Sequence, residues 1–288
     1  LPVTVGRGAI ALGALGLVLV FVVIYRLQPN STNATMAAGA AAWLVGNLLW
    51  LAGQPIGRAV PWWAAFLVLT ITGERLELAR VMLWGQTSRR LYLAALAVSG
   101  AGLLLVLLPG QAAFDAGIRV AGAGLVLLAG WLLRYDVARR TIRRSGLTRF
   151  IAACLLPGYV WLGVGGLLWL RFGGSTLAGP LYDAMLHSIF LGFVFSMIFG
   201  HAPVIIPAVL RIAVPYRPRF YAYLILLHGS LLLRVVGDLT LQPDLRRWGG
   251  LFNAVAVLLF LALTLAPWPR LTSAPERPVL SPAEAENG

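Results

Sequence analysis

The sequence lacks lysine altogether, and it contains one cysteine, three histidines and ten acidic residues among its 288 positions. The single cysteine, Cys154, excludes an intrachain disulfide and any metal cluster built on several thiolates. Charged residues make up only 11% of the chain, whereas soluble domains carry about 25%. This scarcity of charge excludes a surface that faces water on all sides, and it favours a lipid environment.

Motifs of soluble enzymes and nucleic-acid-binding modules are missing as well. The sequence has no glycine-rich phosphate-binding loop, no HExxH and no GxSxG, so hydrolytic or nucleotide-driven chemistry has no support. The 23 basic residues, all of them arginine, give a net charge of +13. Because they cluster in short connections between apolar segments, we expect them to set membrane orientation and not to bind nucleic acid.

Long apolar segments are abundant. Hydrophobic residues account for 59% of the chain, and the mean hydropathy is +0.84. A helix needs about 20 apolar residues to cross a bilayer, and the segments lack the alternation of barrel strands. The sequence therefore predicts an all-α, polytopic transmembrane helix bundle with about nine spans (about eight to ten). The expected spans are residues 9–26, 35–53, 60–80, 91–109, 113–134, 149–171, 181–210, 219–239 and 248–267.

These spans form one predicted transmembrane domain, residues 1–270. The tail that follows, residues 271–288, has the Pro, Ser and Glu composition typical of disorder. With nine spans, the arginine-rich connections after the third, fifth and seventh spans lie on one side. The positive-inside rule makes this side cytoplasmic, which predicts a multi-pass protein of the bacterial inner membrane with its C-terminus inside. The third span is the weakest, and losing it would move the N-terminus to the same side.

All three histidines fall within 42 residues of otherwise apolar helix, at His187, His201 and His228. An ionisable side chain inside a membrane is a functional hypothesis by default, and imidazole is the commonest metal ligand. On an uninterrupted α-helix, the 14 positions between His187 and His201 place them within about 40° of one face but about 21 Å apart. These two residues are therefore predicted to share a face without sharing one metal ion.

His201 and His228 are predicted to form a pair. His201 lies 10 residues before Arg211 and His228 lies 9 residues after Arg219, on antiparallel helices, so both fall about 15 Å from the arginine-rich side. Facing each other, they could be the axial ligands of one haem b or two ligands of a copper ion. Alternatively, each only packs against a neighbour. His187, near the opposite side, is a candidate for a second metal or haem.

Further polar residues accompany the histidines. Asp183, one helical turn before His187, could orient its ring, and Asp238 on the following span falls at a similar height. Arg234 is a candidate cofactor-binding residue that pairs with haem propionates, or else it pairs with Asp238 one turn away.

Two carboxylates near the end of the third span add a further candidate. Glu74 and Glu77 in TGERLELAR either pair with nearby arginines or belong to a proton path. Asp183 and Asp238 are the other carboxylates assigned to that path.

Two segments carry a likeness to a known family. They are His187 followed by SIFLGFVFSMIFGHAP, and the later LLHGSLLLRVVGDL. A membrane histidine that opens a Gly- and Met-containing helix, a second histidine near its end and a downstream Leu-Leu-Arg resemble NnrS-type proteins. These are bacterial polytopic membrane proteins associated with haem, copper and nitric oxide metabolism. The resemblance covers mainly residues 187–238, and by it His187, His201 and Arg234 match family positions.

Two functions follow from these observations. The first is a membrane metalloprotein that binds haem, with or without copper, and acts in nitric oxide stress, electron transfer or cofactor handling. Its partners would be the bilayer and a redox partner or diatomic gas. The second is a cofactor-free transporter or channel-like protein whose histidines and carboxylates relay protons. The sequence leaves open whether the protein is an enzyme, and also its oligomeric state.

Overall fold

The protein is a bundle of long apolar helices. The computed structural model describes residues 3–79, 85–174, 177–211 and 214–265. Within these ranges, nine helical stretches are long and apolar enough to cross a membrane, and no strand is present. The predicted all-α fold and its nine spans are confirmed, including the third span, Ile56–Glu77. The predicted tail, residues 271–288, lies outside the described residues.

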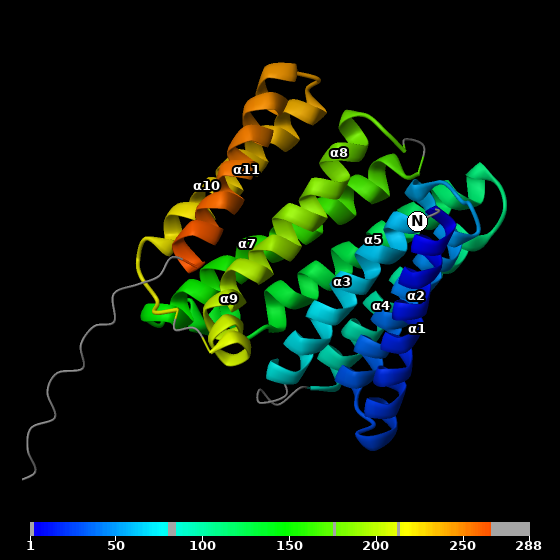
Figure 1. Ribbon diagram of the computed structural model, residues 1–288, viewed down its shortest axis with the longest axis horizontal. Helices are drawn as coiled ribbons and strands as arrows, with labels where there is room; N and C mark the ends of the chain where they lie inside the picture. Colours follow the sequence, from blue (N-terminus) through cyan, green and yellow to red (C-terminus); the bar gives the residue numbers. More distant parts are fainter. Residues whose placement is uncertain (1–2, 80–84, 175–176, 212–213, 266–288) are drawn as a thin grey trace, which may run out of the picture.

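The helices form three groups along the chain, as Figure 1 shows. The first group occupies one side, the second the middle and the third the other side. The first group is α1 (Val3–Leu27), α2 (Ser31–Leu51), α3 (Ile56–Ala79), α4 (Gln86–Leu107) and α5 (Gln111–Tyr135). The second is the short α6 (Ala138–Thr141), α7 (Gly146–Phe172), α8 (Pro180–His187), η1 (Ser188–Phe195) and α9 (Ser196–Leu210). The third is the hairpin of α10 (Phe220–Leu239) and α11 (Pro243–Leu265).

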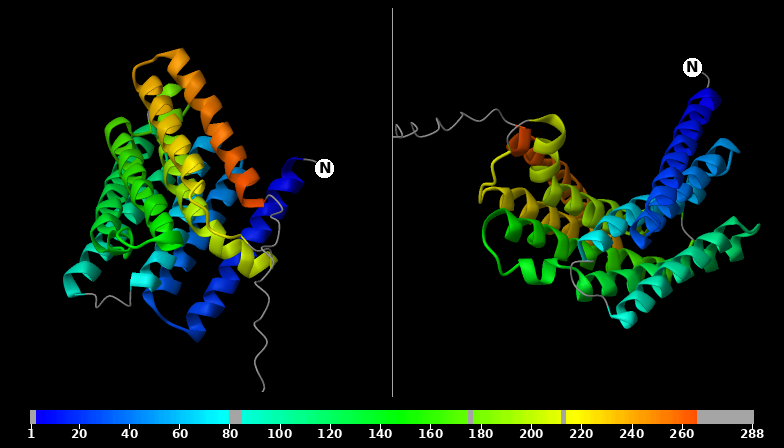
Figure 2. Two further views of the ribbon diagram at one scale, coloured as in Figure 1. Left: turned by 90° about the vertical axis from the view of Figure 1, so that its left-hand side faces the viewer. Right: turned by 90° about the horizontal axis from the view of Figure 1, so that it is seen from below.

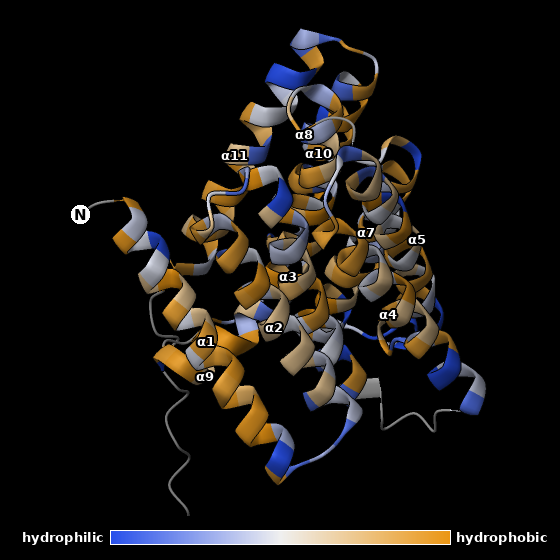
Figure 3. Cartoon of the chain, turned by 90° about the vertical axis from the view of Figure 1, so that its right-hand side faces the viewer, coloured by the Kyte–Doolittle hydropathy of each residue, from blue (hydrophilic) through white to orange (hydrophobic). Residues whose placement is uncertain are grey.

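Helix α7 lies at the centre of the bundle. It packs against α5 on one side and against α8, η1 and α9 on the other, while α10 packs against α8, η1 and α11. The two outer groups lie on opposite sides of this centre in the right-hand view of Figure 2. Helix α1, which packs against α2, exposes large apolar side chains such as Leu12 and Leu19. Apolar residues cover the middle of the helices in Figure 3, as expected for a surface that faces lipid.

Glycines allow several helices to approach closely. Gly102 of α4 lies against the backbone of Ala121 and Gly117 on α5, and Gly122 of α5 lies against Gly166 of α7. Small residues are the usual contact surface of membrane helices, because no hydrophobic effect drives helices together in lipid. These contacts bind the first group to the centre of the bundle.

The seventh span, Pro180–Leu210, contains an irregular segment that is not predicted from the sequence. Proline inside a helix usually kinks or ends it, yet α9 continues through Pro203 and Pro207 and ends at Leu210, where Arg211 adopts φ 57°. The irregular part comes earlier, as the eight-residue π-helix η1. The interval between His187 and His201 is therefore not an uninterrupted α-helix.

Candidate functional site

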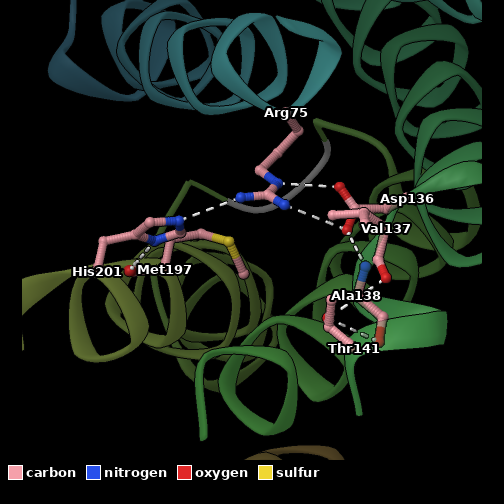
Figure 4. A network of polar contacts seen from close by, with 7 residues as sticks. All are labelled: Arg75, Asp136, Val137, Ala138, Thr141, Met197 and His201. Carbon is pink, nitrogen blue, oxygen red and sulfur yellow. Dashed lines mark hydrogen bonds and ion pairs between the residues drawn. The ribbon is translucent and has the colours of Figure 1, made fainter. Parts of the chain in front are cut away.

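A buried ion pair joins the end of α5 to α3. The Arg75 Nε atom lies 2.9 Å from Asp136 Oδ2 and its Nη2 lies 3.3 Å from Oδ1, a two-point contact (Figure 4). The exposed fractions of the two side chains are 4% and 1%. Asp136 directly follows α5, and its Oδ1 also accepts the Ala138 backbone N–H at 2.7 Å. The Tyr159 hydroxyl of α7 lies close to both charges. We call Arg75, Asp136, Tyr159 and His201 the inner cluster.

His201 completes the inner cluster from α9. Its Nδ1 lies 2.7 Å from the Met197 carbonyl oxygen, so Nδ1 carries the hydrogen and donates it. Its Nε2 therefore holds the lone pair, and it lies 3.2 Å from Arg75 Nη1, which donates to it (Figure 4). The one nitrogen that could bind a metal thus faces a guanidinium ion.

His228 has a different partner on α7. The Trp161 indole Nε1–H, which can only donate, lies 3.1 Å from His228 Nδ1. In a neutral imidazole the hydrogen is then on Nε2, which is buried and has no hydrogen-bond partner among the described residues. Ligation of iron or copper through Nε2 would require this hydrogen to leave and the Trp161 contact to break.

His187 and Asp183 belong to a second cluster, which also joins α8 to α10. His187 Nδ1 lies 2.8 Å from the Asp183 carbonyl oxygen and 3.2 Å from its Oδ1. Among the described residues, no hydrogen bond to the Nε2 lone pair of His187 is found. Asp183 Oδ2 accepts from Arg234 Nε at 2.9 Å and from Nη2 at 2.8 Å. Arg234 therefore pairs across the helices with Asp183, and this contact replaces the predicted pairing with Asp238.

Asp238 of α10 belongs to the same cluster. Its exposed fraction is 0%, and its Oδ1 lies 2.5 Å from Arg246 Nε of α11. Arg246 also reaches Asp183 Oδ2 at 3.8 Å. We call Asp183, His187, Arg234, Asp238 and Arg246 the outer cluster. It brings together His187, Asp183, Asp238 and Arg234, all of which are site residues predicted from the sequence.

The structure corrects the expectation that His187 and His201 share a helix face. His187 lies in the outer cluster beside α10, whereas His201 faces α3. The reason is the π-helix between them, because its i→i+5 turns hold more residues than the turns of an α-helix. An angle calculated from 3.6 residues per turn therefore does not apply here.

His201 and His228 are not joined by any hydrogen bond or ion pair within the described residues. Gly200, next to His201, packs on Leu155 of α7, whereas Trp161, the partner of His228, packs on Gly192. Leu155 and Trp161 are about 9 Å apart along α7. These contacts place the three histidines at three different heights along α7. The described residues contain no group of three His, Cys, Asp or Glu side chains that could hold a metal ion.

The remaining predicted residues lie at the end of α3. Glu74 is exposed and within electrostatic reach of His201, and Glu77 accepts the Thr32 hydroxyl at 3.0 Å. The sequence reading missed Asp136 and Trp161. Asp136 had one signal, because it is the only acidic residue in an arginine-rich connection.

A match to a protein family covers the residues of both clusters. A family described as a domain of unknown function, DUF8744, matches residues 1–268. The chain belongs to the DUF8744 family. Both clusters and all three histidines of this DUF8744 protein lie within the matched residues. No curated protein and no solved structure matches the chain.

Proposed function

We propose that this DUF8744 protein conducts protons across the membrane along its seventh span. The observation that carries the proposal is the repeated composition of its two clusters, the inner one largely buried and the outer one partly exposed. Each combines an aspartate, an arginine and a histidine, and both histidines belong to the span Pro180–Leu210. Chains of histidine and carboxylate groups inside a membrane are typical of proton relays.

The hydrogen bonds suggest how each histidine would handle a proton. The Asp183 carboxylate lies beside the Nδ1–H of His187, which leaves Nε2 as the nitrogen that could pass a proton on. His228, held by Trp161, lies at the level between the other two histidines. A proton on His201 Nε2 would displace Arg75, because two positive groups would then face each other. Proton arrival at the inner cluster would thereby change the contact that holds α9 to α3.

The π-helix supports the same proposal. Segments of this kind are rare and frequently mark functional sites, and η1 lies between His187 and His201. Its Gly192 packs directly on Trp161, the hydrogen-bond donor of His228. A change in the conformation of the π-helix would therefore shift the three histidines relative to one another.

Proton flux into proteoliposomes tests the proposal. With a potassium diffusion potential and a trapped pH-sensitive dye, the wild-type protein is expected to acidify the vesicles faster than protein-free vesicles. His187→Gln and His201→Gln are each expected to reduce the rate at least about tenfold, equivalent to about 1.4 kcal/mol on the barrier. Asp115→Asn is the matched control, since it removes a partly exposed ion pair with Arg119 outside the path. Flux equal to that of protein-free vesicles, or unaffected by both histidine variants, overturns the proposal.

Haem or copper binding, with a role in nitric oxide stress, electron transfer or cofactor handling, is the second candidate. One observation favours it, namely the Nε2 lone pair of His187, whose ring is oriented by Asp183 as second-shell groups orient metal ligands. His201 and His228 do not fit an axial pair, because Arg75 faces one ring and Trp161 donates to the other.

A visible spectrum with metal analysis distinguishes the two functions. Protein purified from haem- and copper-replete cells is expected to show no Soret band and no stoichiometric metal. A Soret band that disappears in His187→Ala, but not in Asp115→Asn, would establish the second candidate instead. A band that disappears in His201→Ala and His228→Ala would show that the two rings rearrange around a haem.

We also propose that the arginine-rich connections that follow α3, α5 and α9 face the cytoplasm of a bacterial inner membrane, which places the C-terminus inside. The support is the exposure of Arg139, Arg140, Arg143 and Arg144 in one connection. A cysteine at Arg143 is expected to react with an impermeant thiol reagent only from the cytoplasmic side, because the native Cys154 is buried. Labelling from the outside alone would reverse the orientation.

A further inference from the structure

Among the acidic residues that the structure describes, Asp238 is fully buried, with an exposed fraction of 0%, and its carboxyl group accepts no hydrogen bond. Its contact with Arg246 Nε is an ion pair whose geometry is not that of a hydrogen bond. Burying an ionised carboxylate without hydrogen bonds costs free energy.

Asp183, by contrast, is well supported as an anion. It accepts two hydrogen bonds from Arg234, lies 3.2 Å from His187 Nδ1, and is within 3.8 Å of Arg246. Both carboxyl groups converge on the one Arg246 guanidinium, so they are neighbours. Two adjacent carboxylates repel each other, and a single proton shared by the pair removes this repulsion.

We propose that Asp238 is the group of the outer cluster that binds and releases a proton. When the proton adds to an Asp238 oxygen, the new hydroxyl has the Asp183 carboxylate as acceptor. Arg246, which already lies 3.8 Å from Asp183 Oδ2, is then released to that carboxylate. No covalent bond between heavy atoms forms or breaks.

The other charged groups near Asp238 leave this assignment intact. Asp183 and His187 face it from α8, Arg234 lies one turn away on α10, and Arg246 faces it from α11. Two more charges of α11, at Asp244 and Arg247, are exposed. The nearest charge at this end of α7, Arg171, lies against the ring of Phe172.

The inference deepens the proposed conduction by naming the outer proton-binding group, and its role in flux rests on that function. The protonation itself can be measured without flux. Infrared difference spectra of the full chain in lipid, recorded between about pH 8 and about pH 6, are the test, because exposed aspartates and glutamates stay ionised across that range. A protonated carboxyl band is expected in the wild type and in Asp115→Asn, and it is expected to be absent in Asp238→Asn.

A second variant tests the role of the neighbouring charge, and circular dichroism of both variants checks that they keep the helical fold of the wild type. In Asp183→Asn the neighbouring negative charge is gone and Arg246 is left to Asp238 alone, so the band is expected to disappear although Asp238 is present. A band that persists in Asp238→Asn, or a wild type with no band, overturns the inference. A band lost in both variants without any proton flux keeps the inference and removes the proposed function. Flux without a band does the opposite.

Discussion

Asp136→Asn is expected to lower the free energy of unfolding by about 3–5 kcal/mol, the cost of leaving one member of a buried ion pair without its partner. The uncompensated charge would be Arg75, whose side chain is 4% exposed. Asparagine keeps an oxygen that can accept the Ala138 N–H, so the loss reports mainly on the ion pair. Unfolding by denaturing detergent in mixed micelles measures the difference.

Two further variants make this expectation specific. Asp115→Asn breaks the Asp115–Arg119 pair, whose side chains are 29% and 40% exposed, and exposed pairs are worth about 0–1 kcal/mol. The double variant Arg75→Met with Asp136→Leu removes both charges and is expected to recover much of the lost stability, because replacing a whole buried pair by apolar residues is often neutral. Equal losses in Asp136→Asn and Asp115→Asn would contradict the assignment of Asp136 to a buried pair.

Gly102→Ala is expected to destabilise the protein by about 2 kcal/mol, within the range for overpacked interfaces. A Cβ atom at Gly102 would meet the Ala121 backbone nitrogen, and it would lie 2.7 Å from both Ala121 Cα and the Gly117 carbonyl oxygen. Since these are backbone atoms, only separation of α4 from α5 could relieve the clash. The same mixed-micelle unfolding experiment measures the loss.

Gly100→Ala is the matched control, two positions earlier on the same helix. A Cβ atom at Gly100 would meet no atom within 4 Å, and alanine is about 1 kcal/mol better than glycine inside a helix. The control is therefore expected to be neutral or slightly stabilising. If both substitutions change stability in the same direction and by the same amount, close packing of α4 on α5 is not what Gly102 provides.

The spans could be predicted because they depend on one property, apolar length, which a sequence displays directly. The third span was recognised despite its short apolar part, and α3 buries Arg75 against Asp136 instead of exposing it. Helix ends were less accurate. Prolines usually mark a bend, but α9 of the seventh span continues through Pro203 and Pro207, and the irregular part is the π-helix, which no residue type specifies.

The candidate site was predicted in part. Rarity of charge in apolar helices identified His187, Asp183, Arg234 and Asp238, and the structure brings these four together. Partner choice was not predictable, because it depends on how helices far apart in the sequence face one another. Arg234 bonds to a residue 51 positions earlier.

Asp136 of the inner cluster and Trp161, the partner of His228, were not predicted from the sequence either. Asp136 was missed because its arginine neighbours suggested only a basic connection. Trp161 was missed because an indole in a membrane helix usually packs or lies at the interface. Whether any of the three histidines binds a metal stays a prediction.

The inner cluster also has a consequence for biosynthesis. Most helices pack against a neighbour in the chain, such as α1 with α2 or α4 with α5, so these hairpins can form as they leave the ribosome. The partners of Arg75 are synthesised later, because Asp136 lies 61 positions and His201 lies 126 positions further along the chain. Until Asp136 has been made, the newly made chain holds an uncompensated cation in its third span. Quality-control proteases that recognise such charges could therefore distinguish a chain that has completed its fifth span from one that stopped before it.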